Sequence, residues 1–124
     1  MVALGNRVHI YARPEVRVQL SQCLTTIFGC GEPRSLEAPS LSEPILAWIF
    51  PNGGSLSVEF TAGALDEGQA RRGAWLELRA DDPPALRKRV LEAGLPRLEY
   101  LGNEYFVIPG GQVVRISEAS SQDS

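Results

Sequence analysis

Hydrophobic and polar residues follow one another along the chain in two similar rounds. In the first round, Arg7–Ala12 alternates with the two-residue period of a strand, and apolar residues then recur at helical spacing from Val16 to Ile27. Pro14 suits the first turn of that helix, and Gly29 suits its end. The stretch after Gly29 predicts a loop with one short edge strand, at residues 35–38.

The first round ends in two more strands. Residues 45–50 form a continuous apolar run of strand length, and residues 55–60 alternate cleanly. The segment between them contains Asn52-Gly53, which is a strong hairpin signal. The first round therefore predicts the order strand–helix–strand–strand–strand, in which the short edge strand at residues 35–38 follows the helix.

The second round repeats this order. An alternating strand is predicted at 74–80, and a helix follows it because Asp82 is a good cap and Pro83 suits a first turn. Gly94 ends that helix, and strands are predicted at 97–101, 104–108 and 112–117. The segment WIFPNGGSLSV of the first round parallels FVIPGGQVV of the second. We interpret the two rounds as a duplicated βαβββ unit within one domain, 1–124.

The boundaries of the two units follow from the same pattern. Module one is expected at about 5–62 and module two at about 73–118. The polar, Gly- and Ala-rich residues 63–72 are expected to be a linker, and the tail 119–124 is expected to be disordered.

The composition and charge of the chain argue against several classes of function. The 124 residues have a net charge of -3, which gives no basic face for nucleic acid or a membrane surface. No apolar run is long enough to span a bilayer and no export signal is visible, so we expect a cytoplasmic protein. Cys23 and Cys30 fit no zinc motif and are expected to be reduced thiols. The sequence contains no P-loop and no nucleophile elbow.

The second round carries the most specific motifs, WLELRADDPPALRKRVLEAGL and EYFVIPGGQVVRI, and the first matches more loosely through HIYARPEVRVQLSQCLTTIFG. Together they resemble the vicinal-oxygen-chelate superfamily, which includes glyoxalases, bleomycin resistance proteins and extradiol dioxygenases. The resemblance spans residues 5 to 118. It implies an α+β fold in which two βαβββ modules form a curved mixed sheet around a concave cleft, with helices on the outer face. It also implies a homodimer.

Alternation predicts which side chains point away from the helices and line the cleft. That face is expected to carry His9, Tyr11, Ser57, Glu59, Trp75, Glu77, Arg79, Val113, Arg115 and Ser117. Aromatic walls with a few placed polar groups suit a small-molecule pocket. The alternative is that this face is exposed to water or covered by a partner subunit.

The resemblance also implies four metal ligands, two from each module. In module two the usual His falls on Trp75 and the usual Glu on Arg115, and neither side chain has a lone pair to offer a cation. In module one we expect His9 and Glu59 at the ligand positions, with Ser57 the rival of Glu59. If a metal is bound, its ligands would be His9, Glu59 and Glu77. Otherwise we expect no metal, no cofactor and no catalytic residue.

Three functions remain open. The first is metal-independent binding of an aromatic or antibiotic-like molecule, as in the bleomycin-resistance branch. Trp75, Trp48 and Tyr105 would stack on the ligand, Arg115 would pair with an anionic group, and Glu59 or Glu77 would accept hydrogen bonds from amines. His9 and Tyr11 would complete the wall. The second is a metal-dependent lyase, isomerase or dioxygenase, and the third is a protein-interaction module that uses the concave face.

Overall fold

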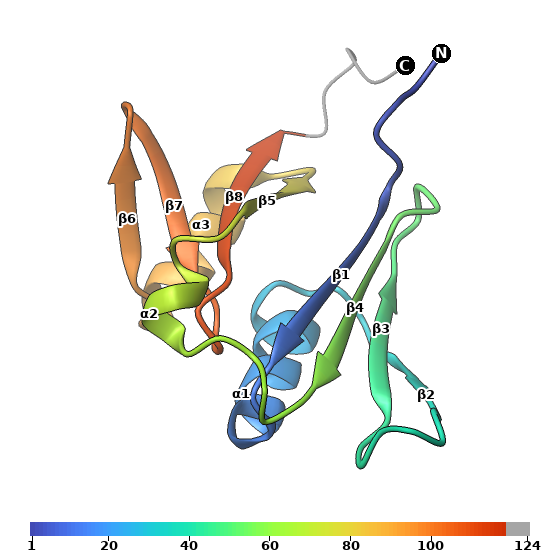
Figure 1. Cartoon of the computed structure of the whole chain (residues 1–124). Coiled ribbons are helices and arrows are strands. Elements are labelled where there is room, and N and C mark those ends of the chain that lie inside the picture. The colour runs from blue at the N-terminus through green and yellow to red at the C-terminus, as the bar shows by residue number, and fades with distance from the viewer. Residues whose placement is uncertain (119–124) are drawn as a thin grey trace. The chain divides into compact units, whose positions relative to one another are not determined.

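The computed structural model of the chain describes residues 1–118 and contains two four-stranded mixed sheets, here called sheet A and sheet B (Figure 1). The chain divides into two compact units between Leu65 and Asp66. Module one below denotes residues 1–65, and module two the described residues from Asp66 onward. This boundary falls inside the segment expected to be a linker, 63–72. The tail expected to be disordered, 119–124, lies outside the described residues.

Module one contains sheet A and one helical segment. The strands of sheet A lie in the order β1-β4-β3-β2, with β1 parallel to β4 and the other neighbours antiparallel. Its elements are β1 (Arg7–Ala12), a 3₁₀ turn (Pro14–Val16), α1 (Arg17–Gln22), a π-helical turn (Cys23–Ile27), β2 (Arg34–Leu36), β3 (Ile45–Ile49) and β4 (Ser55–Phe60). The expected single helix is thus built of three kinds of helical turn.

Module two repeats this order after one extra turn of helix. The strands of sheet B lie in the order β5-β8-β7-β6, and β5 is parallel to β8. Its elements are α2 (Glu67–Ala70), β5 (Trp75–Ala80), α3 (Pro83–Glu92), β6 (Arg97–Tyr100), β7 (Asn103–Val107) and β8 (Val113–Glu118). Each module therefore has the βαβββ order, and the α+β fold is confirmed.

Local chemistry sets the ends of the helices of module two. Asp82 accepts a hydrogen bond from the backbone N of Ala85 and so caps α3, and Pro83 occupies its first turn. Gly94, with a φ of 81°, lies just beyond the last turn. α2 lies within the expected linker because Asp66 and Gln69 form a reciprocal capping box. Among the helices of residues 1–118, none has the length and apolar character needed to cross a membrane.

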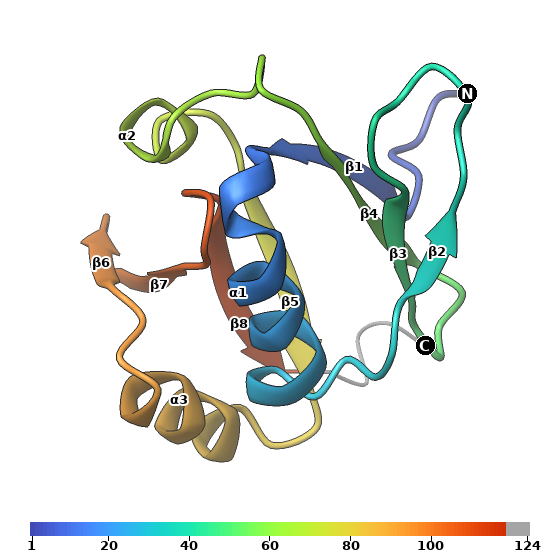
Figure 2. The ribbon, with the colours of Figure 1, turned by 90° about the horizontal axis from the view of Figure 1, so that it is seen from below.

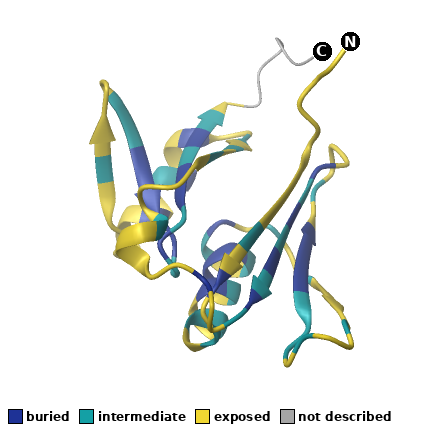
Figure 3. Ribbon diagram, in the orientation of Figure 1, coloured by how far each residue is buried: buried dark blue, intermediate teal, exposed yellow. Residues whose placement is uncertain are grey.

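The helical segment of module one covers one face of sheet A, which we call its helix face. Trp48 lies on this face, is fully buried, and donates a hydrogen bond from Nε1 to Oγ1 of Thr25 over 3.2 Å. The guanidinium carbon of Arg17 lies 4.9 Å from the centre of the Phe60 ring. Strand β1 lies at the edge of the sheet and is largely exposed, as Figure 3 shows. Val8, which alternates with His9 and so points to the helix face, is therefore still 37% exposed.

Helix α3 covers the helix face of sheet B, packing against β8 and β5 (Figure 2). Leu86 and Val90 of α3 are buried, as are Phe106 and Val114 of the sheet. Leu76 and Leu78 of the edge strand β5 are only half-buried. The core of each module thus lies under the inner strands of its sheet, which leaves the opposite face for other contacts.

The two modules correspond residue by residue around their last hairpin. In each, the residue before the turn proline exchanges two backbone hydrogen bonds with the residues that follow it, at 2.9 to 3.0 Å. The bonded pairs are Phe50 with Gly53 and Gly54, and Ile108 with Gly111 and Gln112. Ser55 is therefore the counterpart of Val113, and Trp48 the counterpart of Phe106. This supports the duplication inferred from the sequence.

Candidate functional site

The candidate site residues lie on the face of each sheet that points away from its helix, here called the open face. On sheet A, His9 pairs with Ser57 and Tyr11 with Glu59. On sheet B the open face carries the alternating residues of three strands, which are Trp75, Glu77, Arg79, Asn103, Tyr105, Val107, Val113, Arg115 and Ser117. The alternation read from the sequence therefore assigned the faces of β1, β4, β5 and β8 as the structure has them.

A cluster of polar side chains that contact one another occupies the open face of sheet A. Nδ1 of His9 lies 2.7 Å from Oγ of Ser57, and Nε2 lies 3.1 Å from Oε1 of Glu59. The ring of Tyr11 meets the His9 ring edge-on, with 5.1 Å between centroids. Both imidazole nitrogens of His9 and the Glu59 carboxylate thus already have partners within the cluster.

An aromatic pair with an apolar base occupies one end of the open face of sheet B. Tyr105, Val107 and Val113 form a buried cluster there, and Leu98 packs against it. The Trp75 ring lies 5.3 Å from the Tyr105 ring, at 63° to it, and remains 47% exposed. The buried Tyr105 ring thus packs edge-on against the exposed indole of Trp75 and restricts its movement.

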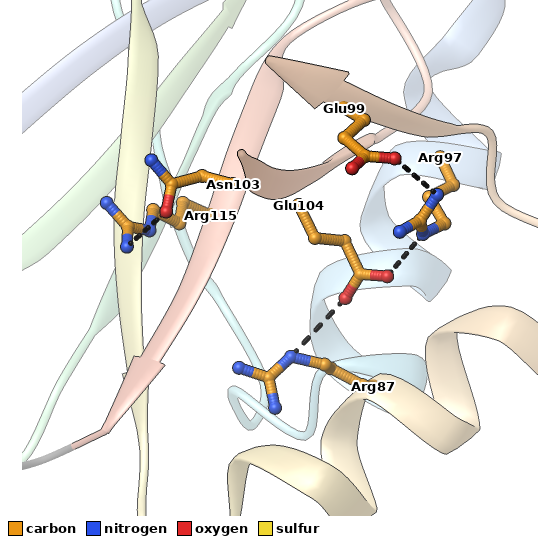
Figure 4. Close-up of polar contacts among 6 residues, drawn as sticks. All are labelled: Arg87, Arg97, Glu99, Asn103, Glu104 and Arg115. Carbon is orange, nitrogen blue, oxygen red and sulfur yellow. Dashed lines mark hydrogen bonds and ion pairs between the residues drawn. The ribbon is translucent and has the colours of Figure 1, made fainter. Parts of the chain in front are cut away.

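Charged side chains occupy the other end of the same face. Nε of Arg79 lies 3.4 Å from Oε1 of Glu77, so these two neighbours form an ion pair. Arg115 is half-buried and donates from Nη2 to Oδ1 of Asn103 over 3.1 Å (Figure 4). No carboxylate of residues 1–118 forms an ion pair with Arg115. Its partner is a neutral amide.

Two residues of this face were missed or given no role from the sequence. Asn103 lies one residue before the expected start of its strand, although its spacing of two from Tyr105 indicates the same face. Ser117 was placed on the face without a role. Its Oγ is buried and has no hydrogen-bond partner within residues 1–118.

Trp48 does not belong to this group of rings. Its position on the helix face and its complete burial are incompatible with stacking on a ligand, which corrects the expectation from the sequence. Figure 4 also shows ion pairs on the helix face of module two, where Glu104 contacts Arg87 and Arg97, and Arg97 contacts Glu99. The hydrogen bond with Glu104 raises the pKa of Arg97. These pairs tie α3 to β6 and β7 and lie outside the candidate site.

The two cysteines are also outside the site and are poor nucleophiles. Burial, with a smaller contribution from Cys30, raises the pKa of Cys23 to about 12. Burial raises the pKa of Cys30 to about 11. Both cysteines are free, and both remain protonated thiols at neutral pH.

In module two, the side chains at the metal positions implied by the family resemblance do not fit a metal ion. These positions hold Trp75 and Arg115, whose nitrogens only donate hydrogen bonds. The strand pairing makes Arg7 the counterpart of Trp75 and Ser57 the counterpart of Arg115. His9 and Glu59, expected at the ligand positions of module one, are the counterparts of Glu77 and Ser117. Within residues 1–118, no three His, Cys, Asp or Glu side chains are grouped as metal ligands.

Comparison with known proteins relates the chain to others through its fold. No family model and no curated protein sequence matches it. Among solved structures, the fosfomycin resistance protein FosX from Listeria monocytogenes has a TM-score of 0.67 at 12% identity, and the match covers 98% of this chain and 95% of that one. A mutant of that FosX was solved with Mn(II) and 1S,2S-dihydroxypropylphosphonic acid.

Two proteins from Streptomyces sp. CB03234 are also similar. TnmS3, an antibiotic binding protein, has a TM-score of 0.62 at 15% identity, and the match covers 96% of this chain and 98% of that one. A glyoxalase/bleomycin resistance protein has a TM-score of 0.59 at 16% identity, covering 92% of this chain and all of the other. At these identities the likeness concerns the fold.

Proposed function

Because the chain has the fold of the vicinal-oxygen-chelate superfamily, we propose that it is a metal-independent protein that binds a small molecule with a flat ring system. The observation that carries this proposal is the Trp75–Tyr105 pair on the open face of sheet B. An exposed indole fixed on a buried ring offers a large apolar contact that loses little conformational freedom on binding.

Several features support binding without chemistry. In module two, the positions where the superfamily usually holds its metal carry Trp75 and Arg115, which cannot ligate one, and both thiols have raised pKa values and are protonated. His9 is held between Ser57 and Glu59 within its own module. We propose that none of these groups acts in catalysis.

The similar structures include an antibiotic binding protein, which supports antibiotic-like molecules as candidate ligands and resistance by sequestration as a role. We further propose that the protein works in the cytoplasm as a homodimer, as the family resemblance implies. Sedimentation velocity of the purified chain tests the homodimer directly, since a monomer at micromolar concentration would contradict it.

Tryptophan fluorescence tests the proposed function because the chain has two tryptophans in different environments. The Trp48→Phe variant keeps Trp75 as the reporter, and Trp75→Phe keeps the buried Trp48 as a matched control. Titration with a library of metabolites and antibiotics should quench or shift the Trp75 signal and leave the Trp48 signal unchanged. If no compound in the library changes the Trp75 signal, the proposal fails.

A metal-dependent enzyme is the second candidate, favoured by the similarity to FosX, whose mutant binds Mn(II). Elemental analysis of the purified protein separates the two. We expect less than stoichiometric Mn, Fe, Ni and Zn. A stoichiometric metal that is lost in His9→Ala would establish the enzyme reading instead.

A further inference from the structure

The charges on the open face of sheet B do not cancel. Glu77 and Arg79 neutralise each other as neighbours on β5, with 3.4 Å between Nε and Oε1. Arg115 is held by the amide oxygen of Asn103, which orients the guanidinium and leaves its charge uncompensated. Among residues 1–118, the ionised side chains of this face thus sum to one positive charge, located at Arg115.

The carboxylates that would attract a cationic ligand are already engaged. Glu59 lies 3.1 Å from Nε2 of His9, and Glu77 is paired with Arg79. An incoming amine would therefore have to share a carboxylate whose charge is already balanced by a neighbouring side chain at Glu77, or that already contacts His9 at Glu59. An incoming anion would meet Arg115 without breaking an ion pair, because residues 1–118 supply it with none.

The guanidinium is also shaped for an oxyanion. Oδ1 of Asn103 accepts a hydrogen bond from Nη2, and the other donors of the planar group are not used by any described residue. Two parallel hydrogen bonds to a carboxylate or phosphate are the contact that arginine forms best. Half-burial strengthens such a contact relative to one in open water, since the local dielectric is lower.

The distance from the rings to the charge limits the size of the ligand. Arg115 lies two residues along β8 from Val113, which pairs with Trp75. Two residues of a strand span about 7 Å. A ring system of one or two fused rings that carries its oxyanion directly on the ring could therefore contact the indole and reach the guanidinium together.

We infer that the open face of sheet B selects a planar aromatic anion, with the rings against Trp75 and a carboxylate or phosphate oxygen pair on Arg115. The inference rests on the proposed function and adds the charge and the size of the ligand. It also disfavours the amine-bearing ligand that Glu77 would otherwise attract to this face.

Isothermal titration calorimetry with four naphthalene probes tests the inference. The probes are 2-naphthoate, 2-naphthyl phosphate, neutral 2-naphthalenemethanol and cationic 2-naphthylmethylamine. We expect the naphthoate to bind on the order of tenfold more tightly than the alcohol, and the amine to bind most weakly. Comparison of the carboxylate with the phosphate shows which oxyanion is preferred.

Three substitutions test whether Arg115 produces the preference for an anionic probe. Arg115→Gln can still donate to Asn103 and should bring the naphthoate down to the affinity of the alcohol. Arg115→Lys keeps the charge without the planar donor pair and should retain part of the preference. Arg79→Gln removes the same charge from a paired residue and serves as the matched control, with a change of less than about threefold. Circular dichroism and a thermal melt establish that each variant is folded.

The outcomes separate this inference from the proposed function. Weak binding of both anions, equal binding of the alcohol and the anions, or a preference that survives Arg115→Gln would each overturn the inference. An equal loss in Arg79→Gln would do the same, because it would assign the effect to net charge. The proposed function would still stand if the fluorescence library yields a neutral or cationic ligand, and it would fall only if the library yields none.

Discussion

Trp48 and Phe106 occupy the same position in the two modules, and each is fully buried on the helix face of its sheet. Trp48 pairs with Leu56 in module one, as Phe106 pairs with Val114 in module two. The duplicated hairpins thus keep a large ring at one core position, while the open faces carry different chemistry.

A phenylalanine should therefore replace Trp48 at moderate cost. Trp48→Phe loses the hydrogen bond to Thr25 and part of the ring volume, and we expect the free energy of unfolding to fall by about 1–2 kcal/mol. Trp48→Ala should cost about 3–5 kcal/mol because it leaves a cavity. Urea denaturation followed by circular dichroism measures both. Equal losses in the two variants would show that module one does not accept the ring of module two.

Gly111 should tolerate alanine less well than its counterpart Gly53. Both have positive φ, 98° and 85°, so alanine strains the backbone by about 1–2 kcal/mol at either position. A Cβ on Gly53 would meet no atom within 4 Å, whereas one on Gly111 would lie 2.6 Å from the carbonyl oxygen of Glu67 in α2. We expect Gly111→Ala to lower the free energy of unfolding by a further ~1–3 kcal/mol, measured by the urea midpoint. Equal midpoints would mean that α2 yields to the methyl group.

Removing the hydroxyl of Ser117 should not destabilise the protein. Its Oγ is buried without a hydrogen-bond partner in residues 1–118, so the hydroxyl loses its hydration on folding and gains nothing in exchange. We expect Ser117→Ala to be neutral or stabilising by up to about 1 kcal/mol. Ser57→Ala is the control, because its Oγ lies 2.7 Å from Nδ1 of His9, and it should be destabilising. A thermal melt in which Ser117→Ala is the less stable variant would reveal a partner for that hydroxyl.

The thiols should be almost unreactive in the folded protein. Raising the pKa of Cys23 from 9.0 to about 12 lowers its thiolate fraction at pH 8 by about a thousandfold, and Cys30, at about 11, should react first. Labelling with Ellman's reagent should be more than about 100-fold slower than in guanidinium-unfolded protein. Fast labelling of Cys23→Ala, which leaves only Cys30, would contradict the raised pKa of Cys30.

The same shifts fix the pH dependence of stability. Unfolded thiols ionise near pH 9.0, whereas the folded ones stay protonated to about pH 11 or 12. Their contribution to stability is therefore complete below pH 9 and is lost as the pH rises through this window. Below pH 9 the cysteines should leave the urea midpoint unchanged.

Where apolar and polar residues alternate, the sequence predicts which face of a strand each side chain occupies. Where they do not alternate, this prediction fails. The strands β1, β4, β5 and β8 alternate, so their open-face residues were assigned correctly. Residues 45–50 are apolar throughout, so no pattern in them shows which side chains face the helix. The sequence alone therefore does not reveal that Trp48 points to the helix. Its orientation depends on Thr25, which lies 23 positions away in the chain.

Two other differences have local causes. α2 was not predicted because it is only four residues long and contains Gly68, although Asp66 and Gln69 carry the signature of a capping box. The correspondence of His9 with Glu77 could not be counted from the sequence, because the segment between the first strand and its helix is one residue shorter in module one than in module two. It became visible through the hairpin hydrogen bonds, which fix the strand pairing in both modules.

The passage from one module to the next is confined to a single residue. The carbonyl of Ala64 accepts a hydrogen bond from Nε of Arg13 in module one, and Asp66 already caps α2 in module two. Leu65, between them, is 55% exposed. A break in the backbone after Leu65 would therefore not separate the partners of either hydrogen bond. The bond to Ala64 would stay in module one, and the bond to Asp66 would stay in module two. The protein can accordingly be divided there into two separately made fragments, each of which retains one complete βαβββ unit with its own sheet.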